Sequence, residues 1–342
     1  TARRESSDPQ VILSVSPSSQ RDLGAVMGVM TTTPVAELLS DDLVITDAGI
    51  ETVLVFERGV DLPAFAAFPL LDDDSGRRHL TEYMNDFRAL ADQHNAGLII
   101  ETPTWRANPD WGAELGYSRD DLRRIAHDSV EMAEQARSTR TGSGGSLISG
   151  CIGPRGDGYV PGKTMSNQEA ADYHGQQIGD FADAGVDLVT SFTYSYVEEG
   201  IGVAAAAAER GVPAVIGFTV ETDGRLPSGT PLGEAIQRVD EATGSSVAWY
   251  MVNCAHPEHI ASGLPGSDES WLDRVGALRA NASRLSHAEL DEAEELDAGD
   301  PAELATGYSG LRSRFPGLRV VGGCCGTDIR HVTAIADAWS NT

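Results

Sequence analysis

The chain has 342 residues, of which 41% are hydrophobic, and it carries a formal net charge of −27 at pH 7. A chain of this length can bury a large core, either as two modest domains or as one (β/α) barrel. The negative charge disfavours nucleic acid and anionic membranes as partners, and therefore favours an enzyme that acts on small molecules. A high-salt cytosol would also suit so acidic a surface.

No secretory signal or transmembrane run is evident in the sequence. Apolar stretches such as 97–100 and 204–208 are much shorter than the roughly 20 residues that a spanning helix needs. We therefore expect a soluble, cytoplasmic protein. Residues 1–34 contain polar, turn-prone Ser and Pro clusters and predict a loose, disordered N-terminal arm. Its apolar segment 11–13 could instead pack on the rest of the protein or on a second subunit.

Short β-branched runs alternate with helical patterns from Asp42 onward, a rhythm typical of parallel sheets with crossover helices. The expected strands are Leu43–Asp47, Gly97–Thr102, Ser146–Ile152, Asp187–Phe192, Ala214–Thr219, Val247–Asn253, Val275–Ala280 and Leu318–Gly323. The expected helices are Arg77–His94, Arg119–Arg137, Asn167–Ala184, Glu198–Arg210, Leu232–Thr243, Pro257–Leu264 and Pro301–Phe315. This α/β pattern predicts a single-domain (β/α)8 TIM barrel over residues 35–342.

A doubly wound sheet would fit the same alternation, so the positions of the polar and reactive residues decide between the two. They fall at the C-terminal ends of the expected strands, where barrel enzymes place their chemistry. These residues are Asp47, Glu101, Thr102, Cys151, Asn253, Cys254, Cys324 and Cys325. The sixth and eighth strands can bring their cysteines together only if the sheet closes or nearly closes.

Cys254, Cys324 and Cys325 form a candidate zinc site. Three thiolates from two strand ends would leave one tetrahedral position open, as in catalytic zinc sites. The ordinary alternative is a set of buried thiols without metal. Because the chain has four cysteines and no secreted framework, we expect the thiols to be reduced.

Other residues near these cysteines are given structural roles. Gly322, Gly323 and Gly326 would let the backbone turn sharply, although an ordinary strand-to-helix turn would use them too. Cys151 is expected to be a small buried residue. His256 and His259 should point away from the metal, because Pro257 starts a helix between them.

Four segments together resemble the homocysteine S-methyltransferase family. The resemblance covers the chain from about Asp42 onward, and it rests on the order and spacing of these segments. They are Asp47–Thr52 with Gly59, Glu101–Asn108, Val252–Cys254 followed by Pro257-Glu258, and Gly322–Thr327 with its adjacent cysteines.

This resemblance implies a barrel enzyme with Zn²⁺ as cofactor, held by Cys254, Cys324 and Cys325. A substrate thiol would complete the zinc shell, lose its proton and attack a methyl group on a cationic sulfur or nitrogen. The resemblance also implies that Asp47 is a catalytic residue, alongside the three cysteines. The implied substrate-binding residues are Asp47, Ala48, Gly49, Glu101, Thr102 and Asn253.

Two of these assignments have structural alternatives. Asp47 would grip an ammonium group or guide the thiol, or it would cap the following helix. Trp105 or Trp111 could offer a ring face to the cationic donor, or pack within a loop.

The chain also departs from the family at three places. Phe192 stands where members carry a glutamate that holds the substrate amine, so either Glu101 or Glu221 replaces it or the substrate lacks that amine. Arg279 and Ala280 precede Asn281 where members have an aromatic residue and proline. The acidic run 289–300 predicts a solvated insertion or helix face, or else a cover over the pocket.

We therefore expect methyl transfer from a sulfonium or quaternary ammonium donor to a thiol, with homocysteine giving methionine as the leading reaction. The expected partners are a small-molecule thiol and a methyl donor, with a homo-oligomer allowed and no cobalamin, nucleic acid or membrane involved. A zinc hydrolase and a non-catalytic zinc-binding barrel are the alternative functions.

Overall fold

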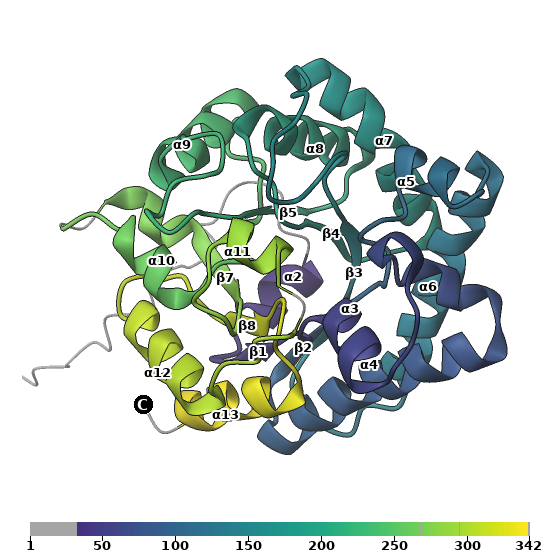
Figure 1. Cartoon of the computed structure of the whole chain (residues 1–342), viewed down its shortest axis with the longest axis horizontal. Coiled ribbons are helices and arrows are strands. Elements are labelled where there is room, and N and C mark those ends of the chain that lie inside the picture. The colour runs from purple at the N-terminus through teal and green to yellow at the C-terminus, as the bar shows by residue number, and fades with distance from the viewer. Residues whose placement is uncertain (1–32, 267–268, 294, 341–342) are drawn as a thin grey trace, which may run out of the picture.

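The computed structural model describes residues 33–266, 269–293 and 295–340, and its eight strands form a closed parallel barrel (Figure 1). Neighbouring strands pair in chain order, and β8 pairs with β1. The predicted (β/α)8 barrel is confirmed, and the doubly wound alternative is excluded. The strands are β1 (Val44–Ile45), β2 (Gly97–Glu101), β3 (Ser146–Ile152), β4 (Leu188–Ser191), β5 (Ala214–Phe218), β6 (Trp249–Asn253), β7 (Val275–Ala280) and β8 (Val320–Gly323).

Helices surround the barrel as an outer ring (Figure 1). Local signals define several of their ends. Ser118 and Ser166 form capping boxes at the starts of α6 and α7, and left-handed Gly185 and Gly211 end α7 and α8. The helices of the ring are α4 (Asp74–His94), α6 (Arg119–Ser138), α7 (Asn167–Ala184), α8 (Val197–Arg210), α9 (Leu232–Thr243), α10 (Pro257–Ser262), α12 (Pro301–Arg312) and α13 (Ile329–Ser340).

Most expected helices agree with the structure to within a few residues, but α13 and several short helices were not predicted. The short segments lie mainly in the loops that follow β1, β2 and β7. They are α2 (Thr33–Leu38), α3 (Ile50–Thr52), a π-helical turn (Val53–Glu57), 3-10 turns (Pro63–Phe65, Phe68–Asp72 and Ser270–Arg274), α5 (Pro109–Glu114) and α11 (His287–Asp291).

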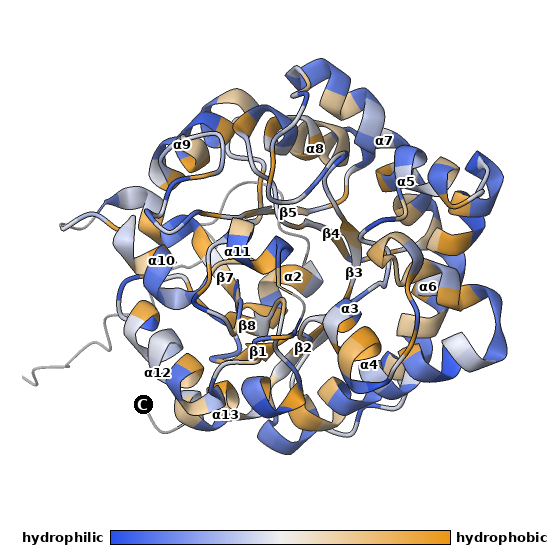
Figure 2. Cartoon of the chain, viewed as in Figure 1, coloured by the Kyte–Doolittle hydropathy of each residue, from blue (hydrophilic) through white to orange (hydrophobic). Residues whose placement is uncertain are grey.

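Alternating strand residues serve two cores. Residues such as Ile45 and Leu98 pack outward against the helices, whereas Val44 and Ile99 fill the barrel interior. Figure 2 shows this arrangement as apolar strands inside helices whose outer faces are largely hydrophilic. Within the described part of the chain, no helix has both the length and the apolar character needed to cross a membrane.

Helix α2 closes the N-terminal end of the barrel. Its Val35, Leu38 and the adjacent Leu39 belong to the same buried cluster as the interior strand residues. Leu38 lies against Gly97, the first residue of β2, where a Cβ would come within 2.8 Å of its Cδ1 atom. Of the predicted N-terminal arm, residues 1–32 lie outside the described residues. With this end filled, the C-terminal mouth remains for chemistry.

Candidate active site and metal centre

The mouth of the barrel contains a cavity of about 510 Å³. Its wall includes residues at or just beyond the C-terminal ends of β1, β2, β3, β4, β6, β7 and β8. These residues are Asp47, Glu101, Cys151, Phe192, Cys254, Arg279 and Cys324. Barrel closure therefore brings most of the predicted site residues to one place.

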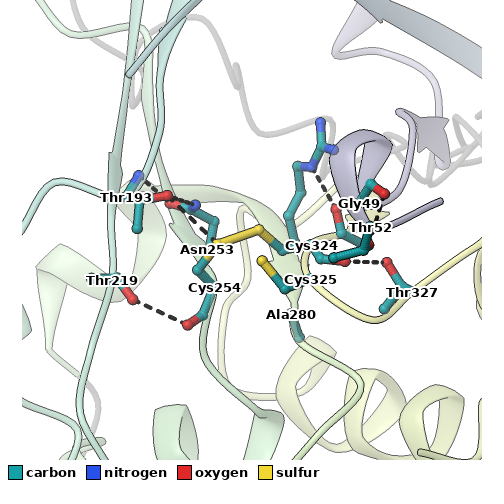
Figure 3. Close-up of a disulfide and its surroundings, with 12 residues drawn as sticks. Gly49, Thr52, Thr193, Thr219, Asn253, Cys254, Ala280, Cys324, Cys325 and Thr327 are labelled. Carbon is teal, nitrogen blue, oxygen red and sulfur yellow. Dashed lines mark hydrogen bonds between the residues drawn. A yellow bond between two sulfur atoms is a disulfide. The ribbon is translucent and has the colours of Figure 1, made fainter. Parts of the chain in front are cut away.

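The three predicted zinc ligands converge on this wall. Cys254 follows β6 and the adjacent pair follows β8, and the sulfur atoms of all three lie within 4.8 Å of one another. Cys254 and Cys324 are joined as a disulfide, with Cys325 beside them (Figure 3). The expectation of reduced thiols is therefore wrong for this pair. Its Cα atoms are 5.4 Å apart, which lies within the span of a disulfide.

The same three sulfurs fit a zinc ion when Cys254 and Cys324 are reduced. Zn–S bonds of about 2.3 Å in a tetrahedron place sulfur atoms about 3.8 Å apart, so the observed cluster needs only small side-chain movements. Among the described residues, no histidine or carboxylate joins this cluster. All three cysteines line the cavity, so a zinc ion that they held would be accessible to a substrate there, as in catalytic zinc sites.

The turn that carries Cys324 and Cys325 is held by backbone contacts. The carbonyl oxygen of Cys324 accepts hydrogen bonds from the amide and the hydroxyl of Thr327. Gly326 has a φ of +75°, so this glycine supplies the left-handed conformation of the turn. Gly49 is required for a different reason, since a Cβ there would lie 2.5 Å from the Cys324 oxygen.

Asn253 supports the site from behind rather than lining the cavity. Its side chain accepts a hydrogen bond from the Thr193 amide (3.0 Å) and donates one to the Thr193 hydroxyl (2.8 Å; Figure 3). Thr193 and Cys254 both adopt left-handed backbone conformations, with φ of 64° and 54°. Such conformations cost energy outside glycine, so the buried Asn253 bridge stabilises a strained pair of strand ends.

Arg279 is a buried residue of the site that sequence reasoning did not identify as functional. Its Nη1 lies 2.5 Å from Asp47 Oδ1 and 3.2 Å from the Thr46 hydroxyl. Its Nε donates to the Gly323 carbonyl and its Nη2 to the Ala48 carbonyl, each at 2.9 Å. The guanidinium therefore ties the ends of β1 and β8 together from β7.

Asp47 is thus part of a largely buried ion pair, in which its side chain is 14% exposed. Burial raises the pKa of Asp47, and the neighbouring Arg279 charge opposes that rise. Asp47 does not cap a helix, because α3 starts after Gly49 and has no side-chain cap. The Ala48 amide donates to the Tyr83 hydroxyl (3.0 Å), so it is not free for a substrate carboxylate. Ala48 and Gly49 nevertheless both line the cavity.

Glu101 and Thr102 both line the cavity, but only Glu101 has an unused polar atom there. The Thr102 hydroxyl contacts that of Thr104 (2.7 Å) and accepts from the Cys151 amide (2.9 Å). Glu101 is 9% exposed, and its Oε2 atom has no hydrogen-bond partner. Burial raises the pKa of Glu101 to about 8, and that of the nearby cavity residue Glu51 to about 7.

The tryptophans predicted to contact the donor are engaged by Arg106. Its guanidinium carbon lies 4.3 Å from the Trp105 ring centroid and 3.9 Å from that of Trp111. Trp105 lines the cavity, whereas Trp111 does not. One cationic stacking position on each ring is therefore already filled within the protein.

Part of the acidic run covers the cavity. Helix α11 and the following segment contribute Leu290, Asp291 and Leu296 to its wall, so the covering alternative holds and the fully solvated one does not. His287 of α11 contacts the Cys254 carbonyl oxygen at 2.8 Å through Nε2, and Glu221 at 3.1 Å through Nδ1. Glu221 lies outside the cavity wall and is therefore unsuited to replace the family's glutamate.

The residues expected to lie outside the metal cluster do so. His256 is the N-cap of α10, where its ring accepts a hydrogen bond from the Glu258 amide. His259, within the same helix, is not a member of the cluster either. Cys151 is buried and lines the cavity as a free thiol.

Comparison with known proteins agrees with this geometry. The family model for homocysteine S-methyltransferase matches residues 44–339. Homocysteine S-methyltransferase 4 of Zea mays is 27% identical over 264 residues, covering 70% of this chain and 75% of the relative. Homocysteine S-methyltransferase YbgG of Bacillus subtilis is 24% identical over 261 residues, covering 70% and 78%.

Solved structures show the same fold. The oxidised form of the homocysteine methyltransferase MmuM from Escherichia coli superposes with a TM-score of 0.71 at 21% identity, covering 90% of this chain and 99% of that one. Its metallated form gives a TM-score of 0.69 at 20% identity, with 89% and 99% covered. The chain belongs to the homocysteine S-methyltransferase family.

Proposed function

We propose that this S-methyltransferase moves a methyl group from a sulfonium or quaternary ammonium donor to the thiol of homocysteine, with a zinc ion held by Cys254, Cys324 and Cys325. The observation that carries the proposal is the convergence of these three sulfurs on the cavity of a barrel that belongs to this family. The fit of the sulfurs to zinc supports the choice of metal.

A zinc ion bound there would favour the thiolate form of the acceptor, which is the nucleophile. The thiolate sulfur forms a bond to the methyl carbon while the carbon–sulfur or carbon–nitrogen bond of the donor breaks. The electron pair of that bond stays with the leaving group, so the donor departs without its positive charge.

The protein's own residues would favour this charge-neutralising reaction in two ways. Glu51, Asp157 and Asp291 place carboxyl groups on the cavity wall, which favours entry of a cationic donor. Leu290, Leu296 and Phe56 give the same wall apolar surface, which limits water near the reacting sulfur.

Metal content tests the first part of the proposal. Protein purified in reductant and loaded with zinc should retain about one equivalent, and Cys324→Ser should retain much less. Cys151→Ser is the matched control, because Cys151 is a buried thiol on the same wall but outside the cluster. Equal zinc in the wild type and Cys324→Ser would contradict the assigned ligands.

Product analysis tests the second part. Zinc-loaded enzyme is given homocysteine with S-methylmethionine, S-adenosylmethionine or glycine betaine, and methionine is measured. Methionine from at least one donor is expected. No methionine from any of them would refute the proposed reaction and direct attention to the hydrolase and non-catalytic alternatives.

The remaining expectations stay predictions. They are a place in methionine biosynthesis, a cytoplasmic location, a homo-oligomer, the absence of nucleic-acid and membrane partners, and a division into an arm (1–34) and a barrel domain (35–342).

A further inference from the structure

We infer that Glu101 on β2, rather than Asp47, receives the ammonium group of the amino-acid thiol. This inference rests on the proposed function and names the residue that selects an acceptor carrying an amine. It is drawn from four features of the cavity.

The first feature is that Asp47 already has a cationic partner. Its contact with Arg279 is buried, and the contacts of this arginine use four of its five guanidinium N–H groups. A substrate ammonium at Asp47 would have to approach this fixed positive charge. Asp47 therefore serves to hold Arg279 and the turn after β1.

The second feature is the absence of an acidic group at the end of β4. Phe192 lines the cavity there, and its ring centroid lies 4.9 Å from the guanidinium carbon of Arg279. The next residue, Thr193, has both its amide and its hydroxyl bonded to Asn253. This part of the wall therefore contains the Phe192 ring and the Arg279 guanidinium, whose charge is neutralised by Asp47. It offers no carboxylate that could bind an amine.

The third feature is the condition of Glu101 itself. A buried carboxylate with an unpartnered oxygen is unfavourable unless a ligand supplies the missing hydrogen bond. An ammonium group would supply both a donor and a compensating charge. Burial raises the pKa of Glu101 although the Arg279 charge and the Ser149 and Thr190 side chains lower it, so the protein compensates this carboxyl only in part and a substrate cation would complete the compensation.

The fourth feature is the register of the barrel. Val44 of β1 pairs with Gly97 of β2 on one side and with Val320 of β8 on the other. Glu101 lies four residues after Gly97, and Cys324 lies four residues after Val320. The two residues are therefore at the same height along the barrel. They are two strand spacings apart, or about 10 Å between backbones. Both line the cavity, so an amino-acid thiol can lie between them.

The test compares homocysteine with 4-mercaptobutanoate, which is the same thiol acid without the amino group. Binding to zinc-loaded enzyme is measured by calorimetry, and kcat/KM is measured with the best methyl donor. The affinity and kcat/KM of wild-type enzyme should be at least about tenfold higher for homocysteine than for 4-mercaptobutanoate. Glu101→Gln should lower both quantities for homocysteine by about 10- to 100-fold. The same variant should change both quantities for 4-mercaptobutanoate by less than about threefold, so the preference for homocysteine should disappear.

Two further variants separate Glu101 from its neighbours. Glu51→Gln removes another buried carboxyl of the cavity and should leave the ratio of the two thiols within about twofold of wild type. Asp47→Asn should affect both thiols alike, because Asp47 positions the turn. The inference would be overturned if either of these variants lost binding and kcat/KM for homocysteine alone. It would also be overturned if Glu101→Gln lost them equally for both thiols.

Calorimetry distinguishes failure of this inference from failure of the proposed function. If wild type binds homocysteine selectively but forms no methionine, and Glu101→Gln abolishes the selectivity, the amine site stands and the methyl-transfer proposal falls. If wild type makes methionine but binds the two thiols equally, the proposed function stands and the inference falls. If neither thiol binds, both fall.

Discussion

Replacing Arg279 by methionine should destabilise the protein strongly, because it leaves Asp47 as a buried carboxylate without its partner. Breaking one side of a buried ion pair typically costs about 3–5 kcal/mol. The carbonyl oxygens of Gly323 and Ala48 also lose their hydrogen bonds. We therefore expect the free energy of unfolding to fall by about 3–5 kcal/mol in Arg279→Met.

The loss should be smaller when both partners are removed. In Asp47→Asn/Arg279→Met neither charge of this pair remains, so the double variant should be more stable than the sum of the single changes predicts, by about 1–3 kcal/mol. The free energy of unfolding of wild type, the two single variants and the double variant is measured by guanidinium chloride unfolding, in reductant and at one zinc concentration. Two spectroscopic probes check that each protein unfolds in a single transition. Additive effects would refute the coupling between Asp47 and Arg279.

The pH dependence of the same cycle provides a further check. The pKa of Asp47 is raised by burial in the folded protein, so its ionisation destabilises the fold as pH rises through that pKa. Arg279 limits this effect. Arg279→Met should therefore lose more stability relative to wild type at neutral pH than in mild acid.

Three further predictions concern single residues of the site. The pKa of Glu101 is raised from 4.5 to about 8 by burial, so ionisation should destabilise the fold as pH rises through this range. The melting temperature of Glu101→Gln, measured without substrates, should therefore rise relative to that of wild type between about pH 5 and pH 8. A difference in melting temperature that does not change with pH would contradict the burial argument. Asn253→Ala leaves the Thr193 amide unpaired and leaves the Thr193 hydroxyl with only its contact to the Cys254 sulfur (3.5 Å). It should weaken zinc binding by about 10- to 100-fold in chelator competition; unchanged affinity would reject this supporting role. Gly49→Ala places a Cβ 2.5 Å from the Cys324 oxygen and should cost about 1–3 kcal/mol in denaturant unfolding, with Ala48→Gly in the same turn as the milder control.

The barrel was predictable because it depends on patterns that are local in the sequence, and the cysteine cluster followed from the expected closure of the sheet. Alternating strands and helices indicated the architecture, and reactive residues at strand ends indicated the catalytic mouth. Closure of the sheet then brought Cys254 to the later pair, as expected. Helix α13 was missed although its buried residues Val332, Ile335, Ala336 and Trp339 follow a helical spacing, a signal that the sequence did contain.

The ion pair between Arg279 and Asp47 could not be predicted from local sequence patterns. Asp47 lies at the opposite end of the sequence, and the two meet only because β7, β8 and β1 are neighbours in the closed barrel. A charged residue at an inward position of an otherwise apolar strand, two residues after Ala277, was the available clue.

The location of the acidic run 289–300 could not be predicted from its composition. A segment exposed to solvent and a polar segment that covers the pocket have similar sequences. The contacts of this run decide the matter. Leu290 and Leu296 of the run line the cavity, and His287, just before the run, contacts the Cys254 carbonyl oxygen. Likewise, the family resemblance implied a substrate-binding role for Asn253, and the sequence alone did not reveal that its bonds to Thr193 join two strand ends.

The apolar seal formed by α2 affects where this protein can be shortened. The region matched by the family model begins at residue 44, but Val35, Leu38 and Leu39 are buried in the barrel interior before that point. A gene designed from the shared region alone would expose Val44 and Ile99 to water at the base of the barrel. Helix α2 (Thr33–Leu38) therefore belongs with the barrel core although it lies upstream of the homologous segment.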